Sequence, residues 1–266
     1  MIGLDPLSRI VSEEMILGIL LVLARSLPLL LLVPFLGGRW VPRSVKLGVA
    51  LAFSVFLLPY LAPPQGSLGA TEIFFLVMKE AAVGTTLGFV ASMVFLGFSS
   101  AGRLVDVQRG VNVFEALDYH AELRGSAMGQ LYGQAAVQVF LLAGGHLVFL
   151  RAYFQSFEAI PVWQFPQFAQ GTTAILDALA RVSADVLWIA LQLSAPALIV
   201  IFLTDVAFGV FGRTAPQVNA FVASQPAKVA IGVGVTLLIL RVLFDQFEAH
   251  GRAMLVHLFR LLEMLE

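Results

Sequence analysis

The residues of this sequence that could carry chemistry gather in two short polar stretches, residues 101–118 and 212–221. The first combines guanidinium, carboxylate and amide side chains, namely Arg103, Asp106, Gln108, Arg109, Asn112 and Glu115. The second holds Arg213, Gln217 and Asn219 around a proline. Such groups form ion pairs and hydrogen bonds to backbone, and the i, i+3 spacing of Arg103 and Asp106 predicts a helical pair. Gly110 permits a turn after them.

The sequence contains no pattern typical of catalysis, of a cofactor or of a metal site. It has no cysteine, which excludes disulfides, thiol catalysis and Cys-ligated metals. It has no phosphate-binding G-x-x-x-x-G-K-[ST] loop, no H-E-x-x-H pair and no G-x-S-x-G turn. The net charge is −1, without an excess of basic residues that would favour nucleic acid. We expect a protein that is not an enzyme, uses no cofactor or metal and does not bind nucleic acid.

Four charged residues lie inside long apolar runs: Arg25, Lys79, Glu80 and Asp205. A charge at the centre of a membrane helix costs at least about 2.5–3.5 kcal/mol. We therefore expect these four to be buried in protein and paired or bonded to amides. Adjacent residues on a helix point about 100° apart, which predicts separate partners for Lys79 and Glu80. The alternative is a small-molecule or ion transporter that uses Arg25, Glu80 and Asp205 as a charge relay, although no internal repeat supports it.

Long apolar segments must position these residues. The sequence is 59% apolar and 12% charged, whereas a soluble domain is about 45–50% apolar and about 25% charged. The composition predicts an all-α membrane protein, because a span needs about 20 apolar helical residues. We expect about six kinked apolar helices, followed by an amphipathic C-terminal helix over 250–266. The predicted apolar segments are 15–36, 47–62, 73–98, 126–150, 182–211 and 227–247.

Two motifs in the polar stretches occur together in a known family. The C-terminal motif is Arg213-Thr-Ala-Pro-Gln-Val-Asn-Ala-Phe221, and the central motif is Gly102-Arg-Leu-Val-Asp-Val-Gln-Arg-Gly110. Together they resemble the FliR/SctT family of type III secretion export-gate subunits, flagellar or injectisome. Further positions match the family at both ends of the chain: Arg25, Pro34, Val41, Pro42, Lys46, Pro196, Asp205, Gly209, Pro226 and Lys228. The resemblance covers nearly the whole chain, so we expect residues 1–266 to form a single subunit.

The resemblance implies a function and a set of partners. The chain would be a channel-lining core subunit of the export gate, passing unfolded proteins across the bacterial inner membrane. One copy would join P/R-type and Q/S-type subunits in a helical hetero-oligomer, largely on the periplasmic side. The switch (B/U-type) and large (A/V-type) membrane subunits would be further neighbours.

The resemblance also implies roles for particular residues. The loop after the third apolar run would project into the channel as a plug, carried by Val111, Val113, Phe114 and Leu117. Packing of Phe114 on a short amphipathic helix is the alternative. The central motif contributes Gly102, Asp106, Gln108, Arg109 and Gly110. A subunit contact would use Arg213, Pro216, Gln217, Asn219 and Phe221.

Two details distinguish this sequence within the family. The central motif usually continues to an Asp-Pro pair, but here it reads Asp118-Tyr119. The pair Val162-Trp163 favours the injectisome branch over the flagellar one.

Overall fold

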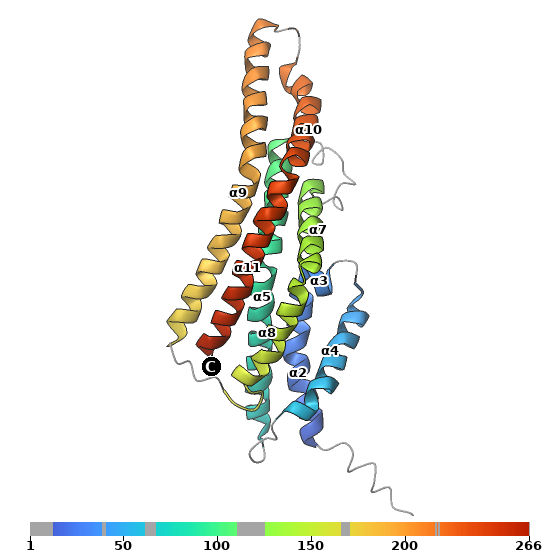
Figure 1. Cartoon of the computed structure of the whole chain (residues 1–266), viewed down its shortest axis with the longest axis vertical. Coiled ribbons are helices and arrows are strands. Elements are labelled where there is room, and N and C mark those ends of the chain that lie inside the picture. The colour runs from blue at the N-terminus through green and yellow to red at the C-terminus, as the bar shows by residue number, and fades with distance from the viewer. Residues whose placement is uncertain are drawn as a thin grey trace, which may run out of the picture. The chain divides into compact units, whose positions relative to one another are not determined.

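The computed structural model describes residues 13–38, 41–61, 68–110, 126–165, 171–215, 217 and 219–265. Within these residues every regular element is a helix (Figure 1), which confirms the predicted all-α class. The elements are α2 (Glu13–Leu32), α3 (Pro34–Gly37), α4 (Arg43–Leu57), the 3₁₀ turn η1 (Leu58–Tyr60), α5 (Ala70–Gln108), α7 (Ala127–Leu142), α8 (Gly145–Ala159), α9 (Gly171–Thr214), α10 (Ala220–Leu238) and α11 (Leu240–Leu265).

Several helices are long and apolar enough to cross a membrane. In the described part of the chain, α2, α4, α5, α9 and α10 meet this test. The pair α7 and α8 meets it together, but the two helices are bent by 77° at their junction. Gly144 at this junction has φ +73°, a conformation that favours glycine. Among the described residues there are therefore five candidate spans, or six if the bent pair counts as one.

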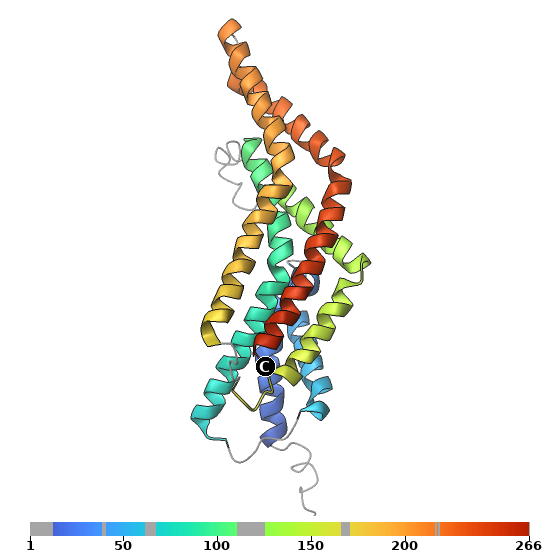
Figure 2. The same ribbon diagram turned by 60° about the vertical axis from the view of Figure 1, so that its left-hand side comes forward.

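The helix boundaries differ from several of the predicted apolar segments. The first, expected over 15–36, is broken at Val33 between α2 and α3, and the fifth, expected over 182–211, begins at Gly171 in α9. The third segment, expected over 73–98, extends to Gln108 in α5, because the polar central motif continues the helix. The fourth, expected over 126–150, is broken at Ala143–Gly144. The sixth, expected over 227–247, is divided at Ile239, where the chain changes direction between α10 and α11 (Figure 2).

The chain divides into two compact units, and the first comprises residues 1–92, 146–179 and 254–266. Here α2 lies beside α4 (Figure 1) and close to the first half of α5. A Cβ on Gly84 would lie 2.0 Å from the carbonyl oxygen of Arg25, so only glycine allows this approach of two helix backbones. Gly88, one turn later, lies against Leu29.

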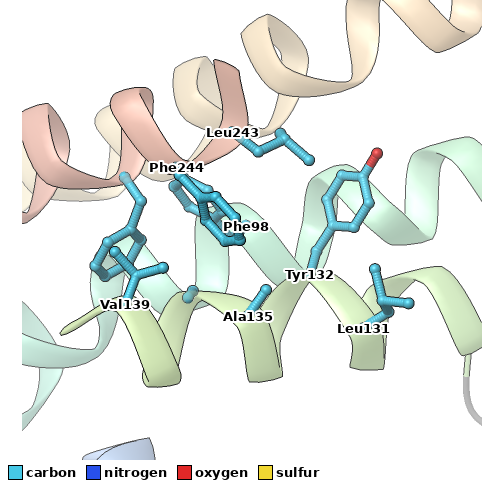
Figure 3. A pocket seen from close by; sticks show the side chains of 9 residues that line it. Phe98, Leu131, Tyr132, Ala135, Val139, Leu243 and Phe244 are labelled. Atoms are coloured by element: carbon cyan, nitrogen blue, oxygen red, sulfur yellow. The ribbon is translucent and has the colours of Figure 1, made fainter. Parts of the chain in front are cut away.

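The second unit comprises residues 93–145 and 180–253. Its core is built on aromatic rings of α5, α7 and α11, with Phe95 and Phe98 packed against Phe247 at centroid distances of 5.7 and 5.1 Å. Beside them lies a small apolar hollow whose walls come from the same three helices (Figure 3). Tyr132 lines this hollow and its hydroxyl hydrogen-bonds to Thr236 of α10.

Candidate functional site: the base of the segment after α5

Asp106, in the last turn of α5, is the centre of a buried hydrogen-bond network and is itself 1% exposed. Its Oδ1 accepts a hydrogen bond from Arg109 Nη1 at 2.8 Å. Its Oδ2 accepts from the Ser126 hydroxyl at 2.7 Å and from the Met128 backbone N–H at 2.9 Å. Ser126 is the N-cap of α7, and its hydroxyl oxygen also accepts from the Gly129 N–H. One carboxylate thus joins the end of α5 to the start of α7.

This network includes residues on both sides of residues 111–125 in the sequence. Arg109 and Gly110 precede the segment, and Ser126 follows it. Gly110 turns the chain with φ +76°, a backbone conformation that a side chain would strain. Asp106 therefore bonds to one residue before and one residue after these 15 residues of sequence.

Helix α10 packs against the same base. A Cβ on Gly232 would lie 2.6 Å from Arg109 Cδ, so the arginine stem occupies the space above that glycine. A Cβ on Gly110 would lie 2.7 Å from Gln225 Oε1. Gln225 is 4% exposed, and neither its amide oxygen nor its amide nitrogen has a hydrogen-bond partner among the described residues. Arg109 Nε is likewise without a partner within the described part of the chain.

The central motif is therefore a packing unit. Gly102 lies against α7, where a Cβ would be 2.2 Å from the Met128 carbonyl oxygen. Gln108, half-buried, ends α5.

The pairing expected between Arg103 and Asp106 is wrong, because Asp106 pairs with Arg109 and Arg103 is exposed. The expected plug residues Val111, Val113, Phe114 and Leu117 lie outside the described residues.

In the first unit, Arg25 of α2 and Glu80 of α5 form a fully buried ion pair, both 0% exposed. The guanidinium contacts both carboxylate oxygens, at 2.5 Å and 3.0 Å. It also donates to the backbone carbonyls of Ser156 and Ile160, each at 2.7 Å. Ser156 lies in the last turn of α8 and Ile160 directly follows the helix, so both carbonyls lie at the end where the helix dipole favours a cation. The Ser156 carbonyl also accepts a hydrogen bond from the Ile160 N–H at 3.0 Å.

Lys79 joins the same cluster. The two neighbours have the separate partners that were expected, since Glu80 pairs with Arg25 while Lys79 donates to backbone carbonyls after α8. They also contact each other, with Lys79 Nζ 2.7 Å from Glu80 Oε1, because the four-carbon lysine stem is long enough to reach that carboxylate. We refer to one cluster as the α8 cap. It consists of the side chains of Arg25, Lys79 and Glu80 and of the backbone carbonyls of Ser156, Ile160, Pro161, Val162 and Gln164.

Asp205 of α9 lies in a separate ion pair in the second unit. Its carboxylate contacts the ammonium of Lys228 in α10. The Lys228 side chain is 8% exposed, whereas that of Asp205 is 36% exposed, so Asp205 is half-buried in this chain taken alone. The pair ties α9 to α10 close to the C-terminal motif.

The C-terminal motif connects α9 to α10 and is largely exposed. Arg213 ends α9, Gln217 lies in the connection, and Phe221 is 58% exposed in the first turn of α10. Asn219 is the N-cap of α10, and its side-chain oxygen accepts from the Val222 N–H at 3.3 Å. Pro216 lies outside the described residues.

Comparison with known proteins decides the family. Residues 16–254 match the family described as Bacterial export proteins, family 1. The chain belongs to this family. Flagellar biosynthetic protein FliR of Bacillus subtilis is 30% identical over 226 residues, which cover 85% of this chain and 86% of the relative. Yop proteins translocation protein T of Yersinia pestis is 32% identical over 185 residues, covering 69% of this chain and 70% of the relative.

A third relative is the secretion system apparatus protein SsaT of Salmonella typhimurium, 28% identical over 231 residues, covering 85% of this chain and 88% of the relative. The resemblance to the FliR/SctT family is thereby confirmed. The names of these relatives refer to flagellar biosynthesis, to translocation of Yop proteins and to a secretion system apparatus, and none of the names is that of an enzyme. With its apolar helices, the chain is an all-α membrane protein of this family.

Sequence reasoning missed the residues that complete both clusters. Ser126, Gln225 and Gly232 belong to the base around Asp106. An N-cap signal at Ser126, directly before an apolar run, could have indicated the first of them. The carbonyls of the α8 cap have no sequence signal, because backbone acceptors carry no residue identity.

Proposed function

We propose that this chain is a channel-lining core subunit of a type III secretion export gate, passing unfolded protein substrates across the bacterial inner membrane. One copy joins P/R-type and Q/S-type subunits, with the B/U-type and A/V-type membrane subunits as neighbours. Much of the helical assembly stands on the periplasmic side. Similarity over 69–85% of this chain to relatives named for flagellar biosynthesis, protein translocation and secretion supports this proposal.

The observation that carries the proposed channel role is the base built on Asp106. It bonds both to Arg109, shortly before residues 111–125 in the sequence, and to Ser126, directly after them. In this proposal Val111, Val113, Phe114 and Leu117 supply the apolar surface of a channel plug. Such a surface seals a pore to ions because water is excluded from it, yet a passing chain can displace it.

Helix lengths support an assembly buried in partner subunits. α5 has 39 residues and α9 has 44, which corresponds to about 58 and 66 Å at 1.5 Å per residue. A bilayer core is only about 30 Å thick. Much of each helix therefore extends beyond the bilayer, while α9 exposes Trp188, Phe202 and Val210 along its length. Such a surface requires apolar protein partners outside the membrane.

The relatives come from both branches of the family, flagellar and injectisome. Val162 and Trp163 support assignment to the injectisome branch. Val162 is buried in the first unit at 2% exposed, and the half-buried Trp163 lies against the position of Gly18 in α2.

Co-expression tests the proposed role. The chain should aggregate or be degraded when made alone, and should be recovered in a stable complex when P/R-type and Q/S-type subunits are made with it. The alternative transporter would behave differently. A stable, monodisperse monomer that moves a small solute into liposomes would contradict the export-gate proposal.

A further inference from the structure

The ammonium group of Lys79 lies within a cage of four oxygen atoms. Three are consecutive or nearly consecutive backbone carbonyls after α8: Pro161 at 2.9 Å, Val162 at 3.1 Å and Gln164 at 2.8 Å. The fourth is Glu80 Oε1 at 2.7 Å. The lysine side chain is 6% exposed, so these oxygens, and not water, solvate its charge.

This geometry is that of a coordination site for a monovalent cation. Backbone carbonyls replace the hydration shell of potassium in channel filters in the same manner. Lysine offers three N–H donors to the four oxygens, whereas a free ammonium ion offers four. We propose that Lys79 is a positioning residue whose ammonium acts as a captive monovalent cation, and that this cation fixes the turn Pro161–Gln164.

The charge balance of the α8 cap favours this role. Arg25 and Lys79 bring two positive charges against the single carboxylate of Glu80. The remaining positive charge faces backbone oxygens at the C-terminal end of α8, where the helix dipole is negative. Arg25 donates to carbonyls at the end of α8, and Lys79 donates to carbonyls beyond it, so each cation serves a different group of backbone acceptors.

The turn held by Lys79 carries two side chains of the core. Val162 is 2% exposed, and a Cβ on Gly18 of α2 would lie 3.7 Å from the Trp163 ring. Three of the oxygens that accept hydrogen bonds from Lys79 belong to this turn. Removing the ammonium would take a donor from each of the three carbonyls, although that of Pro161 would keep its hydrogen bond from the Gln164 N–H at 3.3 Å. The turn should therefore loosen and open to water.

Cysteine labelling tests this inference, since the chain has no cysteine of its own. Val162→Cys places a nearly isosteric, buried thiol on the turn. In the co-expressed, detergent-solubilised complex this thiol should react slowly with a maleimide. Adding Lys79→Ala should raise the rate at least tenfold, and ammonium chloride or methylammonium at about 100 mM should return it to within twofold. Tetramethylammonium, which has no N–H and is too large, should have no effect.

Lys46→Ala is the matched control, because Lys46 is equally buried at 9% exposed but belongs to α4 and to no such oxygen cage in the described chain. Combined with Val162→Cys, it should leave the introduced thiol protected with and without ammonium. If Lys79→Ala does not accumulate, Lys79→Met, similar in length but uncharged, should still expose the thiol. Continued protection in either variant would overturn the proposal. So would exposure in Lys79→Ala that neither ammonium nor methylammonium reverses, since that result indicates packing alone.

Discussion

At the scale of single residues, the buried carboxylates of the two clusters described above each have specific partners. Asp106 accepts three hydrogen bonds, and Glu80 accepts from both Arg25 and Lys79. The sequence predicted that charges inside apolar runs need partners, since isolated charges are too costly there. It mispredicted the partner of Asp106, because Arg103 and Arg109 have the same spacing from it. In the structure the Arg109 side chain occupies the space above Gly232 in α10, and this contact accompanies its pairing with Asp106.

Removing the Asp106 carboxylate should be strongly destabilising. Asp106→Ala leaves the Arg109 guanidinium, 6% exposed, without its counterion, and breaking a buried pair in this way costs about 3–5 kcal/mol. Thermal unfolding of the co-expressed complex should show the loss. Asp245→Ala removes an exposed carboxylate from α11 in the same unit and should change stability by less than about 0.5 kcal/mol. Equal behaviour of the two variants would contradict the assigned role of Asp106.

His250 gives the complex a predictable dependence on pH. Burial in α11 lowers the pKa of His250 from its usual value of 6.5, while the charge of Asp185 acts weakly in the opposite direction. The unfolded chain then binds a proton more readily than the folded chain, so stability is lost as pH falls below about 6.5. The melting temperature should drop between pH 7.5 and pH 5.5, and His250→Gln should drop less. An identical drop in both proteins would show that other groups cause it.

At the scale of elements, sequence periodicity located the apolar helices but not their ends. The third segment was predicted to stop at 98, because Arg103, Asp106 and Arg109 read as a polar loop. In the structure α5 continues to Gln108, since tertiary contacts satisfy those side chains. The break at Ile239 falls within a continuous apolar run and has no local signal, so hydrophobicity alone could not predict it.

The contact between α5 and α7 depends on one glycine. Gly102→Ala would place a methyl group 2.2 Å from the Met128 carbonyl oxygen, so α7 must move away from Asp106. We expect destabilisation of about 1–3 kcal/mol or more, as for other overpacked sites, measured as a lower melting temperature of the complex. Gly234→Ala in α10 is the control, because nothing lies within 4 Å of its added Cβ. That control should be neutral or stabilising.

At the scale of the whole molecule, the chain exposes too much apolar surface to stand alone. Exposed side chains such as Phe56, Leu187 and Leu238 are spread over both compact units. The composition of the sequence predicted a membrane protein, and the chain belongs to a family of bacterial export proteins. Which surfaces face lipid and which face other subunits depends on partner chains, so neither the sequence nor the folded monomer specifies it.

The C-terminal motif is the proposed place of one such subunit contact. Gln217 is exposed here, and in the assembly its amide would bond to a partner chain. Gln217→Ala should weaken assembly by about 1–3 kcal/mol through an unpaired buried group, seen as a lower yield of co-purified complex. Gln246→Ala, whose amide bonds to Gln192 within this chain, should assemble normally. Normal assembly of Gln217→Ala with failed export would instead indicate a gating role for the loop.

The central claim is that the segment after α5 closes a protein-conducting channel at rest. Ion conductance of the reconstituted complex, with residues 111–117 deleted from this chain, tests it most directly. The deletion leaves Asp106, Gly110 and Ser126 in place, so the base and the assembly should persist. We predict an intact complex that conducts small ions at rest, whereas the complete complex is closed. An intact deleted complex with unchanged, closed conductance would contradict the plug and the channel-lining role built on it.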